Sequence, residues 1–167
     1  VDVERVVRLM QDIGVQHVGV ADTIGVGTPR RAQAALERAL KHYPLDEVSG
    51  HFHDTYGQAL ANIYACLELG IATFDTSAAG LGGCPYAQGA TGNVATEDVL
   101  YLLSGLGIET GIDFTKAVAT GQWISSILDR KAHSRAGPGP QRPMQAKRQQ
   151  TESATRNVET TCSPRSA

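Results

Sequence analysis

The chain of 167 residues is long enough for one domain with a substantial core. A hydrophobic content of 41% and a formal net charge of −2 indicate an ordinary soluble protein and exclude the bulk basicity of a nucleic-acid-binding protein. No apolar run approaches the roughly 20 residues of a membrane-spanning helix, and the N-terminus does not resemble a signal peptide, so we expect neither a membrane nor a nucleic acid as partner.

The N-terminal quarter of the chain predicts a helix, a strand and a second helix. Apolar residues recur at helical spacing over residues 3–14, where a glycine ends the pattern. A short β-branched run over residues 15–21 is typical of a buried strand. Thr28 and Pro29 mark a helix start with a capping hydroxyl, and we expect this helix to reach about Lys41.

The strand-loop-helix unit then repeats. We expect strands over residues 47–55 and 71–77, and helices over residues 58–68, 96–105 and 114–128. A glycine-rich loop over residues 80–93 follows the third strand. The acidic pair Glu97 and Asp98, with Thr96, is expected to cap the helix that follows this loop, and Asp113 to cap the last helix.

Successive units of this kind imply parallel strands joined by right-handed crossovers, and hence an α/β fold. Chemistry in such folds collects where the strands end. The polar residues at the predicted ends are Asp22, His51, His53, Asp75, Ser77 and the loop that holds Cys84. Three strands are too few for a closed eight-stranded barrel, which takes roughly 250 residues. The sheet is therefore either small and open or the final part of a barrel.

The two histidines of the second strand are the strongest local signal. His51 and His53 leave a strand on the same side, because side chains alternate along it. Two neighbouring imidazoles make half of a metal site. The alternative interpretation is a pair of hydrogen-bonded surface histidines.

The three cysteines are Cys66, Cys84 and Cys162, an odd number without a Cys-x-x-Cys pair. Neither a disulfide framework nor a zinc ribbon is indicated, and a reducing compartment fits best.

The composition changes after Arg130. Residues 131–167 contain seven Lys/Arg and two Asp/Glu, a surplus of +5 that leaves −7 on the preceding residues. Glycine, proline, glutamine and serine replace the apolar residues, so we predict a domain over residues 1–130 and a disordered basic tail over residues 131–167. A shifted reading frame would produce such a break, and we state it as a hypothesis.

Residues 19–29, 51–62 and 77–98 together resemble the 3-hydroxy-3-methylglutaryl-CoA lyase family. The most specific part is the cysteine loop, Ser-Ala-Ala-Gly-Leu-Gly-Gly-Cys-Pro-Tyr, which begins at Ser77. It resembles the active-site signature of that family, with Ala78 in place of the usual valine. The resemblance covers nearly all of residues 1–130.

This resemblance implies the C-terminal part of a TIM (β/α)₈ barrel, with about three parallel strands and flanking helices. It implies a carbon–carbon lyase that cleaves an acyl-CoA substrate, 3-hydroxy-3-methylglutaryl-CoA, to acetyl-CoA and acetoacetate. The implied cofactor is a divalent metal, Mg²⁺ or Mn²⁺. A homodimer in the bacterial cytoplasm or the mitochondrial matrix is implied as well.

By the family pattern, the metal ligands are His51, His53 and Asn93, and the catalytic residues are Cys84, His51, Asp22 and Glu97. Cleavage requires a proton to leave the tertiary hydroxyl of the substrate, and either His51 or Asp22 could accept it. Cys84 would then protonate or shield the departing enolate.

Each assignment has an alternative. The glycines of the cysteine loop could form only a tight turn or a phosphate-binding nest. Cys84 could be an inert small residue, Asn93 a helix cap, and Asp22 a partner of backbone amides in its own turn. For the whole chain, the alternatives are a metal-dependent enzyme that condenses acyl-CoA and a non-catalytic truncated fragment. The first strand of the family carries an arginine and an aspartate that no part of this sequence matches.

Overall fold

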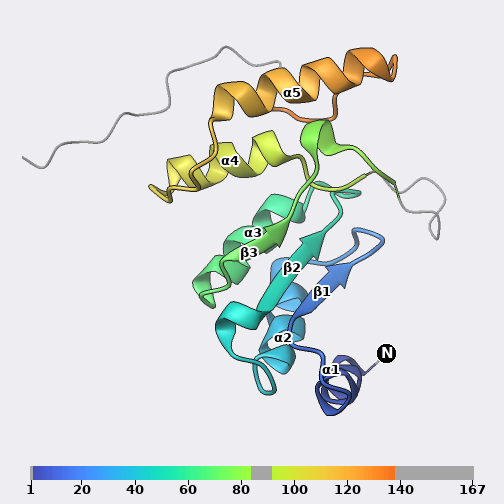
Figure 1. Cartoon of the computed structure of the whole chain (residues 1–167), viewed down its shortest axis with the longest axis vertical. Helices are drawn as coiled ribbons and strands as arrows, with labels where there is room; N and C mark the ends of the chain where they lie inside the picture. The colour runs from blue at the N-terminus through green and yellow to red at the C-terminus, as the bar shows by residue number, and fades with distance from the viewer. Residues whose placement is uncertain (1, 84–91, 138–167) are drawn as a thin grey trace, which may run out of the picture.

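The computed structural model describes residues 2–83 and 92–137. Helices and strands follow one another in the predicted order (Figure 1). They are α1 (Val3–Asp12), β1 (Val18–Asp22), α2 (Pro29–Ala39), β2 (Val48–Phe52), α3 (Ala59–Glu68), β3 (Thr73–Asp75), α4 (Thr96–Gly105) and α5 (Phe114–Ile127). A 3₁₀ turn, η1 (Leu45–Glu47), precedes β2, and another, η2 (Ala78–Gly80), follows β3.

The helix ends agree only in part with the capping pattern of the sequence. Asp113 caps α5 as predicted, since its side chain accepts a backbone N–H at 3.1 Å. Thr28 precedes α2, but its hydroxyl makes no capping hydrogen bond, so that prediction is wrong, and a proline at the start of the helix sets the backbone angle instead. The capping position of α4 is Ala95 and not Thr96.

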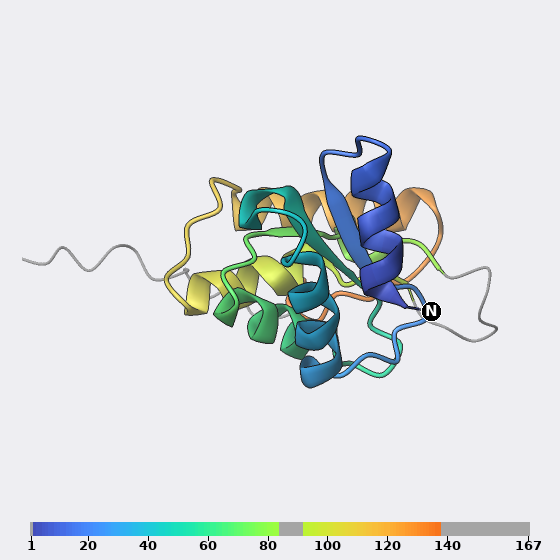
Figure 2. The ribbon, with the colours of Figure 1, turned by 90° about the horizontal axis from the view of Figure 1, so that it is seen from below.

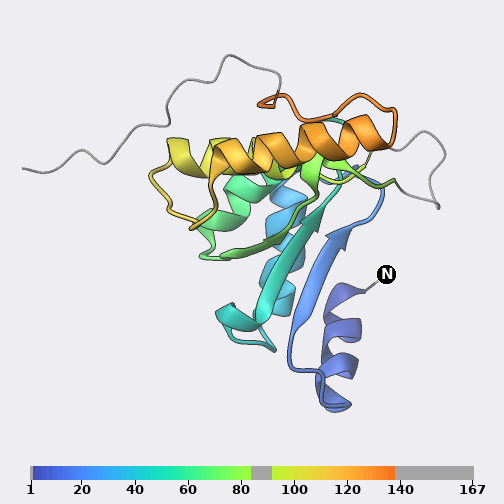
Figure 3. The same ribbon diagram turned by 45° about the horizontal axis from the view of Figure 1, so that its top comes forward.

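The three strands form one parallel sheet in the order β1-β2-β3. Each strand lies beside the one that precedes it in the chain, which is how a barrel winds. The described strands show no reversal of order of the kind that marks a doubly wound sheet. All three therefore direct their carboxyl ends to one edge, which we call the carboxyl edge (Figure 3).

One face of the sheet holds the core. α2 and α3 lie behind the sheet in Figure 1 and pack their apolar sides on it. The core residues Leu36, Val48, Phe52, Ile63 and Ile71 are at most 3% exposed. Their burial is the main source of stability for this part of the fold.

No helix covers the opposite face of the sheet within the described ranges. Its side chains are exposed or half-buried, and they are small or polar: Gly19, Ala21, Ser49, His51, Thr73 and Asp75. In a barrel, this face is the interior. Because little apolar surface lies here, its contact with water costs little.

The remaining helices occupy two places. α1 stands beside β1, at the side of the molecule away from α4 (Figure 2). α5 lies across the carboxyl edge (Figure 3). No helix in the described part of the chain has the length and apolar character needed to cross a membrane.

Residues 131–137, which we call the strap, lie beyond the predicted domain boundary at residue 130 and contact the folded part. The His133 N–H donates to the Ala79 carbonyl at 3.0 Å, and Ser134 is only 4% exposed. The rest of the predicted tail, residues 138–167, lies outside the described residues.

The packing of β2 against its aromatic neighbours gives the first testable prediction. A Cβ atom at Gly50 would lie 2.8 Å from Phe52 Cε2 and 3.1 Å from Phe74 Cδ1. We expect Gly50→Ala to lower the free energy of unfolding by about 1–3 kcal/mol through overpacking, measured by urea denaturation with circular dichroism. Gly105→Ala is the control, because no atom lies within 4 Å of its added Cβ. Equal stability of the two variants would contradict the prediction.

Candidate active site

His51 stands at the carboxyl edge between the other two strands. The strand register places it beside Ala21 of β1 and Asp75 of β3. Its Nδ1 atom is 3.3 Å from Asp75 Oδ2. A carboxylate on one ring nitrogen fixes the imidazole and leaves the other nitrogen for a ligand, an arrangement typical of metal-binding histidines. Both side chains are accessible, His51 at 30% and Asp75 at 62% exposure.

His53 continues the same face of the chain just beyond β2. Its ring centroid lies 5.3 Å from that of His51, with the rings tilted by 46°. In contrast to His51, His53 is only 6% exposed. An isolated bridge pairs His53 with Asn93, which brings the residue predicted as a third metal ligand to the histidines.

Only one of the two polar atoms of the Asn93 side chain has a hydrogen-bond partner among the described residues. Its Nδ2 donates to the Leu81 carbonyl at 3.0 Å. Its Oδ1 is buried and, among the described residues, has no hydrogen-bond partner. A buried amide oxygen without a partner costs free energy unless something else binds it.

Two imidazoles and an amide oxygen form a donor set that suits a divalent cation such as Mn²⁺. Within residues 2–83 and 92–137, no three His, Cys, Asp or Glu side chains are grouped to hold a metal ion. Asparagine is not one of these four residue types, and its side-chain oxygen is the third donor that a divalent cation would need beside the two imidazoles. Three protein donors leave positions for substrate oxygens.

Asp22 lies on the other face of the sheet from these residues. It pairs with Phe52, whose side chain points into the core, and not with His51. Its two carboxylate oxygens accept the backbone N–H groups of Val26 at 3.2 Å and Gly27 at 2.8 Å. The structure thus does not bring Asp22 to the histidines, and this geometry favours the alternative interpretation that Asp22 stabilises its own turn.

The Glu97 side chain faces the turn at Ala78–Gly80. It is 1% exposed, and its two oxygens lie 2.9 and 3.0 Å from the Ala79 N–H. Burial raises the pKa of this carboxyl above its usual value, while hydrogen bonds from its own N–H and from the Ala79 N–H lower it and the charge of Asp98 raises it. Glu97 does not line the pocket described next.

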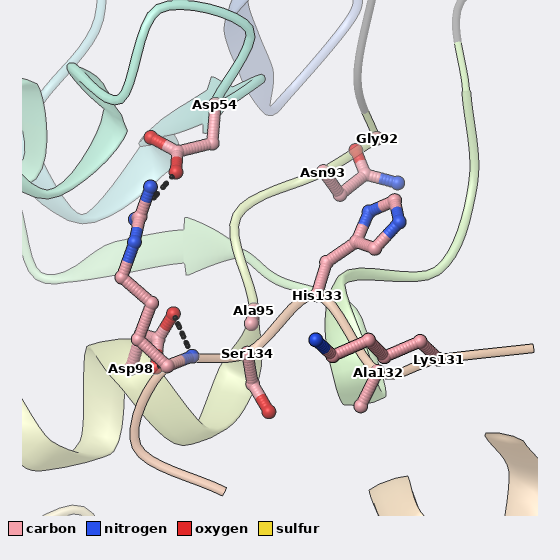
Figure 4. A pocket seen from close by; sticks show the side chains of 10 residues that line it. Asp54, Gly92, Asn93, Ala95, Asp98, Lys131, Ala132, His133 and Ser134 are labelled. Carbon is pink, nitrogen blue, oxygen red and sulfur yellow. Dashed lines mark hydrogen bonds and ion pairs between the residues drawn. The ribbon is translucent and has the colours of Figure 1, made fainter. Parts of the chain in front are cut away.

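A pocket of about 600 Å³ opens beside Asn93 (Figure 4). The strap forms one wall of it, and the His133 imidazole lies beside the Asn93 side chain in Figure 4. No sequence pattern indicated this wall, because the proline- and glutamine-rich composition after residue 130 concealed it. His133 and Arg135 are among the pocket residues that sequence reasoning missed.

Two aspartates hold the strap. Asp98, in the first turn of α4, accepts the backbone N–H groups of Arg135 and Ala136 at 2.7–3.1 Å. Asp54 accepts a hydrogen bond from the Arg135 guanidinium at 3.1 Å and also binds the Ala59 N–H at the start of α3. The strap is therefore tied both to α4 and to the segment that follows His53.

Cys84, the predicted catalytic thiol, lies outside the described residues. The nearest described residues are Gly83 before it and Gly92 after it. The Gly92 carbonyl accepts the Asp54 N–H at 3.2 Å, so this end of the cysteine loop is fixed next to His53.

Residues 1–124 match the model of the HMGL-like family. The chain belongs to the HMGL-like family. Among curated members, it is 56% identical over 131 residues to the 3-hydroxy-3-isohexenylglutaryl-CoA/hydroxymethylglutaryl-CoA lyase of Pseudomonas aeruginosa, covering 78% of this chain and 44% of the relative. It is 52% identical over 131 residues to the mitochondrial hydroxymethylglutaryl-CoA lyase of Arabidopsis thaliana, covering 78% of this chain and 28% of the relative. The chain thus spans less than half the length of these curated relatives.

Solved structures of HMGL-like proteins share the fold. The hydroxymethylglutaryl-CoA lyase of Pseudomonas aeruginosa superposes with a TM-score of 0.77 at 54% identity, over 82% of this chain and 47% of that one. A lyase from Acinetobacter baumannii in complex with coenzyme A and 3-methylmalate gives 0.75 at 31% identity, over 78% and 43%. The predicted α/β fold, part of a TIM barrel, is therefore confirmed.

The strap gives the second prediction. Asp98 is 7% exposed and binds main-chain N–H groups, whereas the Arg135 side chain is 70% exposed. Losing buried hydrogen bonds to a charged acceptor costs about 1.5–3 kcal/mol, and losing an exposed ion pair about 0–1 kcal/mol. We expect Asp98→Ala to accelerate amide hydrogen exchange at residues 135 and 136 far more than Arg135→Ala does. Equal acceleration in the two variants would contradict the prediction, because the ion pair would then hold the strap as strongly as Asp98 does.

The raised pKa of Glu97 gives the third prediction. A carboxyl whose pKa is higher in the folded state than in the unfolded chain loses its stabilising contribution as pH rises through the interval between the two values. The interval here begins near the usual value of 4.5 and extends upward. Glutamine does not titrate. As pH rises from acidic to neutral, the free energy of unfolding of Glu97→Gln should therefore rise relative to that of wild type, measured by urea denaturation. Glu37→Gln, which changes an exposed glutamate, is the control. The prediction is refuted if the free energy of unfolding of Glu97→Gln changes with pH in the same way as that of wild type.

Proposed function

We propose that this chain carries the metal and thiol residues of an enzyme that cleaves 3-hydroxy-3-methylglutaryl-CoA to acetyl-CoA and acetoacetate. The observation that carries the proposal is that the His51 and His53 rings lie side by side and that a bridge pairs His53 with Asn93, whose amide oxygen is buried without a partner among the described residues. It is supported by 56% identity to a relative named as a lyase of this substrate. The activity of the whole enzyme belongs to the proposal, because the chain spans 44% of that relative.

Three side chains would hold the divalent cation, Mg²⁺ or Mn²⁺: His51, His53 and Asn93. When bound, the cation supplies positive charge that acidifies the tertiary hydroxyl of the substrate. Asp75 keeps the His51 ring in place through Nδ1. Asn93 and the strap line a common pocket, which His51 and His53 do not line.

The cleavage reaction needs one proton acceptor and one proton donor. As the hydroxyl proton leaves, the bond between the carbinol carbon and the thioester α-carbon breaks, and its electron pair goes to the acetyl-CoA enolate. We assign the leaving proton to the Asp75 carboxylate, because both ring nitrogens of His51 are engaged when it holds the cation and Asp22 lies on the other face of the sheet. Cys84 then returns a proton to the α-carbon of the enolate.

The substrate and assembly are also proposed by analogy. A related structure was solved with coenzyme A, which supports an acyl-CoA substrate for this chain. The relative from Pseudomonas aeruginosa is also named for 3-hydroxy-3-isohexenylglutaryl-CoA, which makes this longer acyl-CoA a second candidate substrate. We include a homodimer in the bacterial cytoplasm or the mitochondrial matrix in the proposal.

The fourth prediction tests the function. With Mn²⁺, we expect the chain to release acetoacetate from 3-hydroxy-3-methylglutaryl-CoA, and we expect His53→Ala and Cys84→Ala to lower the rate at least about 100-fold. His17→Ala is the matched control, because His17 lies before β1, at the opposite end of that strand from the carboxyl edge. The same assay with the isohexenyl substrate decides between the two acyl groups.

Two outcomes would overturn the proposal. Folded wild-type protein that releases no acetoacetate with either metal would favour a non-catalytic fragment. Incorporation of acetyl-CoA into a 2-keto acid without any cleavage would favour the condensing enzyme.

A further inference from the structure

We propose that Glu97 is a positioning residue that sets the direction of the Asn93 side-chain amide through the turn at Ala78–Gly80. The proposal concerns described residues only, and its bearing on metal binding rests on the proposed function. It replaces the role of active-site acid that the family resemblance implied for Glu97.

The first step is the contact between Glu97 and the turn. Both carboxylate oxygens face the Ala79 N–H, at 2.9 and 3.0 Å, and Glu97 is 1% exposed. Ala79 has φ 55° and ψ 16°, a left-handed conformation that is strained for a residue other than glycine. The hydrogen bond that Glu97 accepts from the Ala79 N–H offsets this strain. Without Glu97, this N–H would be buried without an acceptor.

The second step is the enclosure of this contact. The Ala79 carbonyl accepts the His133 N–H at 3.0 Å, so the residue is held at both its N–H and its C=O. Gly121 of α5 is packed directly on the carboxylate, and any Cβ there would collide with Glu97 Oε1. Glu97 therefore has no open path to a substrate in the neighbouring pocket, which it does not line.

The third step leads from the turn to Asn93. Leu81 directly follows the turn, and its carbonyl accepts the Asn93 Nδ2 at 3.0 Å. The chain on both sides of this bond is in close contact, since a Cβ at Gly80 would lie 3.3 Å from the Asn93 carbonyl oxygen and one at Gly82 would lie 2.6 Å from Asn93 Nδ2. With Nδ2 committed to Leu81, the amide has one orientation. Its other end is the buried Oδ1 without a partner among the described residues.

The test uses the two side-chain N–H resonances of Asn93 in nuclear magnetic resonance, assigned by their loss in Asn93→Ser. In Glu97→Ala, we expect these resonances to move toward the values of a solvated amide and their hydrogen exchange to accelerate at least about tenfold. Mn²⁺ affinity should fall about tenfold, which corresponds to 1.4 kcal/mol. Glu97→Gln can still accept the Ala79 N–H, so we expect it to keep the resonances, the Mn²⁺ affinity and any acetoacetate release.

Two further variants secure the interpretation. Gly121→Ala displaces the carboxylate without removing it, so it should reproduce the Asn93 shifts even if Glu97→Ala does not fold. Glu37→Ala removes an exposed glutamate of α2 and should change nothing.

The proposal is overturned if Glu97→Ala and Gly121→Ala leave the Asn93 resonances in place. It is also overturned if Glu97→Gln keeps the resonances but abolishes turnover, since Glu97 would then act as an acid or a base. A wild-type chain that binds no Mn²⁺ would refute the proposed metal site, whereas the resonances would still decide the role of Glu97.

Discussion

The alternation of side chains along β2 is the constraint on which the site depends. Val48 and Phe52 are buried against the helices, so His51 must leave the strand on the opposite face. A register shift of one residue would expose both core residues and turn the histidine into the core. The hydrophobic core and the position of the imidazole are therefore specified together, and the pairing with Asp75 follows from the same register.

The first turn of α4 has a second organising role. Two adjacent acids there accept backbone N–H groups from different irregular segments, Glu97 from Ala79 and Asp98 from the strap. The positive end of the helix dipole favours negative charge at both positions. One helix terminus thus holds both the 3₁₀ turn before the cysteine loop and the wall of the pocket, which belongs to no helix or strand.

Much of the fold and part of the site could be predicted from the sequence because they follow from periodicity. The strand ends and the shared face of His51 and His53 depend only on alternation and on parallel order. The place of Asp22 on the core side follows from the same alternation, because Val18 and Val20 of its strand pack against the core. The partner of Glu97 is a main-chain group in a left-handed conformation at an alanine, and no residue type signals that.

The bonds that hold the strap make little demand on the identity of its side chains. Its main-chain N–H groups at residues 133, 135 and 136 make the bonds to Ala79 and Asp98, and every amino acid except proline provides such a group. These bonds therefore fix the path of the main chain but leave the choice of side chains in this segment largely unrestricted. The match to the HMGL-like family model ends at residue 124, before the strap begins. Homology searches by sequence would be expected to lose such a wall in distant relatives whose backbones still retain it.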